Sequence, residues 1–124
     1  MATSLYDQVG GEAFFARLVD AFYDRVARNA QLRAMYPDDL AEPREHLVLF
    51  LEQYWGGPST YSATRGHPRL RLRHAPFWID RDARDAWLVA MQGALDSVRD
   101  ELNDDQYAML RDYFESTAHQ LRNQ

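Results

Sequence analysis

The sequence predicts an all-α protein that folds as a single domain over residues 1–124. Apolar residues recur at steps of three and four along most of the chain, and helix-start and helix-stop residues flank these segments. No segment alternates with a period of two for long enough to form a convincing β-strand. The length also favours one domain, because a hydrophobic core seldom divides below roughly 150–200 residues.

The N-terminal part is expected to hold a short helix and then a long one. Ser4, followed three residues later by Asp7, is typical of a capping box, and the glycine pair at 10–11 ends the short helix. Apolar side chains then form one stripe over residues 12–29, which predicts the long helix. The members of this stripe are Phe15, Leu18, Val19, Phe22, Tyr23 and Val26.

Prolines and glycines mark the next helices. A short helical segment through Leu32 and Met35 ends at Tyr36, because a residue that precedes proline disfavours the helical conformation. Pro43 suits the first turn of a further helix, since its missing N–H is not needed there, and Gly-Gly-Pro at 56–58 ends that helix. The apolar stripe of this helix consists of Leu47, Phe50, Leu51 and Tyr54.

The C-terminal half is expected to begin irregularly and to end with two helices. Residues 58–68 contain Pro, Ser, Thr and Gly and are expected to form a loop, and residues 69–75 a brief helical turn. Asp80 is expected to cap the first of the two helices, and Asn103 with Gln106 predicts a cap for the second. The apolar positions are Trp87, Leu88, Met91, Leu95 and Val98 in the first, and Tyr107, Leu110, Phe114, Ala118 and Leu121 in the second.

Composition excludes several classes of protein. The absence of cysteine excludes disulfides, thiolate metal sites, iron–sulfur clusters, thiol nucleophiles and covalent attachment of haem through cysteine. All 14 basic residues are arginine, so Schiff-base chemistry and a Walker-type phosphate loop are excluded too. No apolar run approaches the ~20 residues that span a bilayer, and the net charge of −5 argues against general nucleic-acid binding. We therefore expect a cytoplasmic protein with neither a membrane span nor a nucleic-acid partner.

One segment of the chain is strongly basic. Between Glu52 and Asp80 the sequence has no acidic residue. An acidic protein with one concentrated cationic segment more often binds an anion at that segment than over its whole surface. The alternative is that the segment forms a solvated helix face, which has the same pattern. The basic residues of this interval are Arg65, His67, Arg69, Arg71, Arg73 and His74.

The histidines indicate one kind of metal site. No two of them have the i, i+4 spacing of helical zinc sites. Without cysteine, the remaining common arrangement is a single imidazole that holds the iron of a porphyrin. The propionates of haem would explain the arginines, and its apolar ring would explain an aromatic content of 13%. For any one of His46, His67, His74 and His119, the alternative is an ordinary surface or hydrogen-bonded side chain.

Three polar aromatic residues stand where burial is expected. Tyr23 and Trp87 fall on the apolar faces of their helices, and Tyr36 lies at a helix end. A buried Tyr hydroxyl or Trp N–H without a partner costs roughly 1–3 kcal/mol. These groups therefore either serve one another or a ligand, or each of them finds a backbone carbonyl.

Two long strings carry a resemblance to a known family. Residues 50–77 read FLEQYWGGPSTYSATRGHPRLRLRHAPF, and residues 84–91 read RDAWLVAM. In these strings, and less strongly over essentially the whole chain, the sequence resembles the truncated haemoglobins of group II. The resemblance implies a truncated globin fold, a two-over-two helical sandwich around a haem. The family has glycine pairs after the first short helix and after the distal helix, where this chain has the pairs at 10–11 and 56–57.

The resemblance also implies roles for individual residues. His74 takes the place of the proximal iron ligand. Tyr23, Tyr36 and Trp87 take the three distal polar positions. The other residues expected to contact the haem are Leu47 facing the iron, Phe50, Leu51, Phe77 and Met91 in the pocket, and Arg73, Tyr61 and His67 at the propionates. A distal gate residue near positions 41–43 is not assigned.

The function that the resemblance implies is reversible binding of O2, CO or NO at the iron of a non-covalently held haem b. His74 would bind the iron through Nε2 while Nδ1–H donates to the carbonyl of Leu70, one helical turn back. Hydrogen bonds from the distal residues would make binding tight and release slow. A monomer and a homo-oligomer are both compatible with the sequence.

Two other functions remain open at this point. The same scaffold could act as a haem-dependent redox enzyme, such as a peroxidase, a nitric oxide dioxygenase or a reductase of a nitrogen oxide. Such an enzyme would need an external reductase, because the chain has no room for its own flavin or nicotinamide domain. Alternatively, a haem-free helical module could use residues 65–74 to bind an acidic partner. Turnover with peroxide or NO would indicate the enzyme, and an absorbance band near the violet would exclude the haem-free module.

Overall fold

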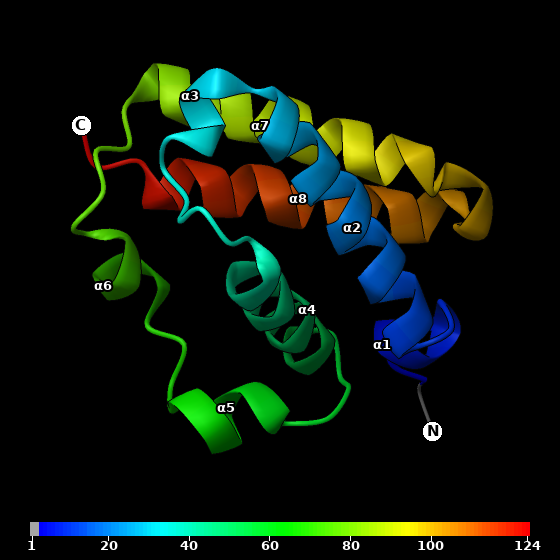
Figure 1. The fold of residues 1–124 in the computed structure, drawn as a ribbon. Coiled ribbons are helices and arrows are strands. Elements are labelled where there is room, and N and C mark those ends of the chain that lie inside the picture. Colours follow the sequence, from blue (N-terminus) through cyan, green and yellow to red (C-terminus); the bar gives the residue numbers. More distant parts are fainter. Residues whose placement is uncertain (1–2) are drawn as a thin grey trace.

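The computed structural model describes residues 3–124 and has the all-α fold that the sequence predicts (Figure 1). The elements are α1 (Leu5–Gln8), α2 (Glu12–Arg28), α3 (Ala30–Arg33), α4 (Ala41–Tyr54), α5 (Thr60–Arg65), α6 (Leu70–His74), α7 (Arg81–Ser97), the 3₁₀ helix η1 (Arg99–Glu101) and α8 (Asp104–Leu121). The described residues form no strand, and none of their helices is long and apolar enough to cross a membrane.

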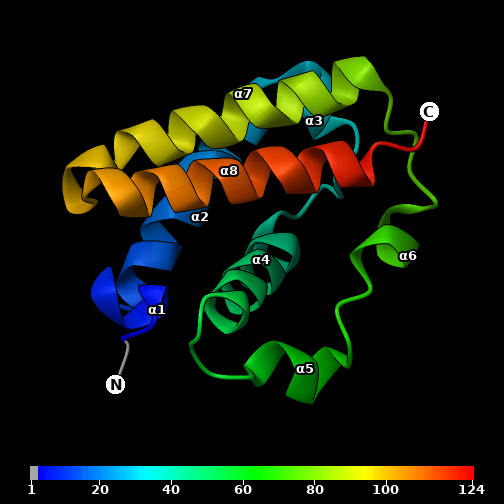
Figure 2. The same ribbon diagram turned by 180° about the vertical axis from the view of Figure 1, so that it is seen from behind.

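Two pairs of helices make the frame of the molecule. The first pair is α2 and α4, the second pair is α7 and α8, and α2 joins the pairs because it also packs against α7. Figures 1 and 2 show α7 and α8 side by side along one edge, with α4 on the other side of the frame and α5 and α6 beyond it. This is the two-over-two arrangement that the family resemblance implies, and the predicted fold is confirmed.

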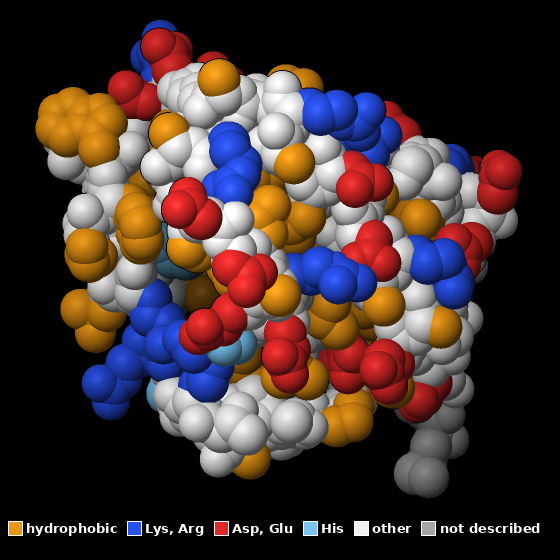
Figure 3. Space-filling model, viewed as in Figure 1, with side chains coloured by type: hydrophobic (Ala, Val, Ile, Leu, Met, Phe, Trp, Pro, Cys, Tyr) orange, Lys and Arg blue, Asp and Glu red, His pale blue; other side chains and the backbone are white. Residues whose placement is uncertain are grey.

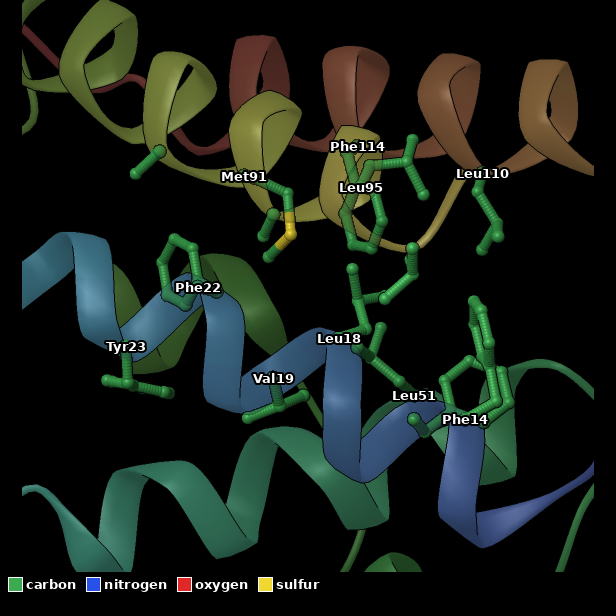
Figure 4. Packing of buried hydrophobic residues seen from close by; sticks show 14 of the residues in the cluster. Phe14, Leu18, Val19, Phe22, Tyr23, Leu51, Met91, Leu95, Leu110 and Phe114 are labelled. Atoms are coloured by element: carbon green, nitrogen blue, oxygen red, sulfur yellow. The ribbon is translucent and has the colours of Figure 1, made fainter. Parts of the chain in front are cut away.

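The apolar stripes of these helices meet in the core. Leu18 and Phe22 of α2 have no exposed surface, and Met91 and Leu95 of α7 are 1% exposed. Figure 4 shows Phe22 of α2 directed at α7, whereas Val19 and Tyr23 point toward α4, whose Leu51 belongs to the same core. Full burial of a side chain of this size contributes about 1.5–3 kcal/mol. The contact between α2 and α7 therefore supplies much of the stability of the frame.

The predicted helix caps are present. Ser4 accepts a hydrogen bond from the backbone N–H of Asp7 at 3.2 Å, and Asp80 accepts one at 2.9 Å from the N–H three residues further on. At the start of α8, Asn103 and Gln106 exchange hydrogen bonds and complete the expected capping box. Each such cap contributes about 1 kcal/mol. Local sequence thus sets the first residue of three helices.

The glycine pair at the end of α4 allows the chain start to pack closely. Gly56 has φ +99, and a Cβ atom there would lie 2.5 Å from Cβ of Ser4. A Cβ atom on Gly57 would lie 2.7 Å from a ring carbon of Tyr6. The backbone N–H of Tyr6 donates to the carbonyl of Trp55 at 3.0 Å. Larger residues at the pair would push α1 away from the end of α4.

One predicted loop is partly helical. Residues 58–68 were expected to be irregular, but Thr60–Arg65 form α5. The reason is tertiary packing, which outweighs the local preference of Pro, Ser, Thr and Gly for turns. The side-chain amide of Gln53 on α4 accepts from the N–H of Ser62 at 2.9 Å and donates to its hydroxyl at 2.8 Å. Tyr61, 4% exposed, packs edge-on against Phe50.

Candidate functional site

An apolar cavity of about 390 Å³ is lined by residues of the four frame helices, α2, α4, α7 and α8, and of α6. Its volume falls in the range of roughly 300–1,000 Å³ that is usual for small-molecule and cofactor sites. Figure 3 shows a hollow on this side of the molecule, next to a cluster of arginine side chains. Most of the predicted site residues line the cavity: Tyr23, Tyr36, Leu47, Phe50, Leu51, Tyr61, Arg73, His74, Phe77 and Trp87.

His74 is the last residue of α6 and presents one ring nitrogen to a defined partner. Its Nδ1 atom lies 2.7 Å from the carbonyl oxygen of Leu70. Because a carbonyl oxygen can only accept, Nδ1 must carry the hydrogen. In the neutral imidazole the lone pair is then on Nε2, which has no hydrogen-bond partner within residues 3–124. The expected bond to Leu70 is present, and the free nitrogen is of the kind that binds metals.

Three polar aromatic side chains reach the same cavity from different elements. Tyr23 comes from α2, Tyr36 from the segment after α3, and Trp87 from α7. The rings of Tyr23 and Tyr36 meet edge to face with centroids 5.6 Å apart. Trp87 lies with its ring 5.5 Å from that of Phe22. The three residues therefore converge, and the sequence pattern alone did not establish this.

Burial keeps both tyrosine hydroxyls protonated. Burial raises the pKa of the Tyr23 hydroxyl well above its usual value, and the neighbouring Tyr36 adds to this effect. The pKa of Tyr36 rises to about 12, because burial outweighs the hydrogen bonds with Trp87 and Tyr23 that act in the opposite direction. Both phenols, together with the indole N–H, are hydrogen-bond donors throughout the physiological pH range.

Arg73 lines the cavity and also braces the neighbouring loop. Its Nε atom donates to the carbonyl of Pro68 at 2.7 Å, and Nη2 donates to the carbonyl of Arg65 at 2.9 Å. The guanidinium carbon lies 5.8 Å from the ring centroid of Tyr61. These contacts hold a cation at the cavity wall, and they give Arg73 a structural role that the sequence did not predict.

Several lining residues were not predicted from the sequence, and two of them, His46 and Arg84, carry basic side chains. His46 of α4 lines the cavity, and its Nε2 accepts from Nη1 of Arg65 at 3.0 Å. Arg84 of α7 also lines it and donates from Nη1 to Nδ1 of His119 at 3.1 Å. A signal existed for His46, which is three residues after Pro43 and four before Phe50 and hence on one helix face. No comparable signal marked Arg84.

Two predicted residues do not line the cavity. His67 is exposed, and its Nδ1 accepts from the backbone N–H of Arg69 at 3.1 Å. Met91 is 1% exposed and belongs to the core between α2 and α7. Trp87, one turn earlier on α7, forms the cavity wall instead. Near the unassigned gate, Pro43 lines the cavity.

A model of the bacterial-like globin family matches residues 4–123. The chain belongs to the bacterial-like globins. The match spans the frame helices as well as the elements that carry the cavity.

Individual relatives of this globin point to group II. It is 47% identical over 88 residues to group 2 truncated hemoglobin YjbI of Bacillus subtilis, covering 71% of this chain and 67% of that protein. It superposes on the hemoglobin of Chloroflexus aurantiacus with a TM-score of 0.95 at 46% identity, covering 99% of this chain and 100% of that one. For the truncated oxygen-avid haemoglobin of Bacillus subtilis the TM-score is 0.91 at 40% identity, with 98% and 100% covered. The predicted resemblance is confirmed.

Membership in this family implies a haem cofactor and small diatomic ligands such as O2. The residues of this globin fit a haem. The cavity offers an imidazole with a free Nε2, apolar walls for a flat ring, and the arginines Arg73 and Arg84 in its lining for two carboxylates. Tyr23, Tyr36 and Trp87 add two hydroxyls and one indole N–H to its lining.

Proposed function

We propose that this globin binds O2 reversibly at the iron of a non-covalently held haem b, with His74 as the protein ligand. When bound, haem supplies a ferrous iron that takes O2, CO or NO as a ligand. The observation that supports the proposal most strongly is the hydrogen bond from Nδ1 of His74 to the carbonyl of Leu70. It fixes the tautomer whose Nε2 carries the lone pair, in a cavity that holds three hydrogen-bond donors.

On the side of His74, the chain orients the imidazole ring. The bond to Leu70 holds the imidazole plane and keeps Nε2 available as a metal ligand. A carbonyl partner makes the imidazole less electron-rich than a carboxylate partner would. Electron-rich imidazoles favour peroxide cleavage, so the carbonyl favours reversible ligand binding over peroxidase chemistry. The proximal geometry thus supports the O2-binding function rather than the peroxidase alternative.

The chain contributes donors on the ligand side. The hydroxyls of Tyr23 and Tyr36 and the N–H of Trp87 can donate to a ligand oxygen inside a cavity with apolar walls. Each hydrogen bond of about 1–1.5 kcal/mol slows ligand release by roughly tenfold when it acts alone. The three groups contact one another, so their effects are not additive. We therefore propose slow release, and the oxygen-avid haemoglobin of Bacillus subtilis, 40% identical, supports this proposal.

Replacing Trp87 by Phe tests the proposed ligand stabilisation. This substitution keeps an aromatic ring in the wall and removes the N–H, so we expect O2 release about tenfold faster in stopped-flow measurements. Trp78→Phe is the matched control, because Trp78 is 67% exposed and does not line the cavity. Its release rate should equal that of the wild type. An unchanged rate in Trp87→Phe would remove Trp87 from the ligand site.

A further inference from the structure

Basic and apolar side chains are exposed together on α5, α6 and the segment that leads to α7. Arg65, Arg69 and Arg71 are exposed, and none of the ion pairs formed within residues 3–124 includes them. Leu72 and Trp78 are each 67% exposed. We call these five residues the basic patch. Figure 3 shows arginine side chains gathered beside the hollow, with exposed hydrophobic side chains along the same edge.

The composition of the basic patch is that of a protein interface. Arg and Trp are enriched at such interfaces and often dominate the binding energy, whereas Lys is depleted. Leu72 and Trp78 add exposed apolar surface to the arginines, and apolar surface rimmed by polar residues indicates contact with a partner. No acidic residue occurs between Glu52 and Asp80, so the segment supplies no carboxylate of its own to compensate these charges. The complementary surface is therefore acidic and also offers apolar contacts.

The charge of the remaining molecule favours a compact partner. The chain has a net charge of −5, and without the patch arginines the remainder is more negative still. A nucleic acid or an anionic membrane is an extended anion and would face this acidic remainder as well as the basic patch. A small acidic protein can contact the basic patch alone, so it does not face the acidic remainder of the molecule. The charge distribution thus favours a protein over the extended anions.

The basic patch forms the outer side of the cavity wall. Arg73 and His74 line the cavity from the same helix that carries Arg71 and Leu72. Phe77, which stands next to Trp78 in the chain, lines the cavity and is also 44% exposed. A partner seated on the patch would therefore lie beside residues that line the cavity.

We propose that the basic patch docks an acidic one-electron donor protein, of the flavin or iron–sulfur class, that keeps the cofactor iron ferrous. This inference rests on the proposed function, because only ferrous iron binds O2 reversibly. One electron passes from the reduced partner to ferric iron, which becomes ferrous, and the partner is oxidised by one electron. The step transfers no proton. The role of the patch is to orient the partner and raise the rate of encounter.

A plant-type ferredoxin, an acidic protein that carries one electron, is a suitable probe. Binding of its oxidised form is measured by calorimetry at low ionic strength, and reduction of the ferric globin by its reduced form is followed at the haem absorbance band. The test variant is Arg69→Glu/Arg71→Glu, whose residues do not line the haem cavity. The matched control is Arg28→Glu/Arg111→Glu, which changes the net charge equally at exposed sites on α2 and α8.

We expect the patch variant to bind the ferredoxin with at least tenfold lower affinity than the wild type. Its reduction by the ferredoxin should also be at least tenfold slower. The control should lose less than threefold, and 0.5 M NaCl should remove most of the difference, because salt screens exposed charges. Trp78→Ala should weaken binding without changing its salt dependence. Equal losses in the two double variants would overturn the proposal. So would binding to phosphatidylserine vesicles with none to the ferredoxin.

The outcomes separate this inference from the proposed function. O2 release by the patch variant should equal that of the wild type, because the substitutions lie outside the cavity. Normal O2 binding with unchanged ferredoxin association would overturn only the docking surface. A protein that takes up no haem would overturn the proposed function, whereas oxidised ferredoxin would still report whether the patch binds an acidic protein.

Discussion

The carbonyl of Leu70, 2.7 Å from Nδ1 of His74, decides which nitrogen of the imidazole is free to bind a metal. In the same cavity, burial holds Tyr23 and Tyr36 in the phenol form. Each side chain of the site thus owes its chemical form to one or two neighbours. These chemical forms determine how the site and the fold respond to pH.

Ligand release should not depend on pH near neutrality. The pKa of Tyr36 is about 12 in the folded protein, and that of Tyr23 is also raised above the ordinary value of 10. Because the folded-state pKa is raised, the phenol form contributes stability fully below pH 10 and loses it only as the pH rises toward 12. We therefore expect a constant O2 release rate from pH 6 to pH 9 in stopped-flow experiments. A several-fold acceleration within this interval would contradict the assigned donors.

Glu52 should destabilise the fold when it is charged. Its side chain is 6% exposed, and burial, together with the charge of Glu12, raises its pKa above 4.5. A raised folded-state pKa means that the favourable contribution exists at low pH and is lost as the pH rises through that pKa. Glu52→Gln should accordingly raise Tm at pH 7 and leave it unchanged at pH 4. The exposed Glu115→Gln serves as control and should shift stability by less than ~0.5 kcal/mol. A lower Tm at pH 7 would contradict this reasoning.

Some of these residue properties could be read from the sequence. The bond between His74 and Leu70 was predictable, because helix geometry places the carbonyl of residue i−4 one turn before the ring. The cavity position of Arg84 was not predictable, because it depends on how α7 lies against the end of α8. Local spacing determines contacts within a helix, but contacts between helices need the packed structure.

Among the helices, α5 depends most on contacts with residues outside its own segment. Its six residues contain no long apolar side chain except Tyr61, and the segment was predicted as a loop. Gln53 of α4 and the burial of Tyr61 against Phe50 hold it in place. The long helices α2, α7 and α8, in contrast, were predictable because their apolar stripes and caps are encoded within each segment. Even there, spacing did not reveal that Trp87 faces the cavity and Met91 the core.

Replacing Gln53 by Ala should detach α5 from α4. The substitution removes two partly buried hydrogen bonds to Ser62, each contributing about 0.5–1.5 kcal/mol. We expect roughly 1–3 kcal/mol lower stability of this segment and faster backbone hydrogen exchange in residues 60–65, measured by mass spectrometry. Gln120→Ala is the control, because Gln120 is exposed and bonds only to Ser116, within its own helix. Unchanged exchange in α5 would contradict the proposed anchor.

For the whole molecule, the hydrophobic core and the cavity share a wall. The core between α2 and α7 is apolar (Figure 4), and five of its residues also line the cavity: Phe22, Tyr23, Leu32, Leu51 and Phe114. The cavity is walled by the four frame helices and by α6. The fold class was predictable because the whole-chain pattern and the family resemblance agree. The placement of the basic patch over the cavity wall follows only from the three-dimensional structure.

The central claim is that Nε2 of His74 holds the haem iron. The most direct test is the ferrous absorption spectrum of His74→Gly after reconstitution with haem, with and without added imidazole. His67→Gly is the control, because His67 is exposed and does not line the cavity. We expect His74→Gly to lose the wild-type spectrum and to release haem at least tenfold faster, imidazole to restore the spectrum, and His67→Gly to be unaffected. A wild-type ferrous spectrum in His74→Gly without imidazole would show that His74 does not hold the iron.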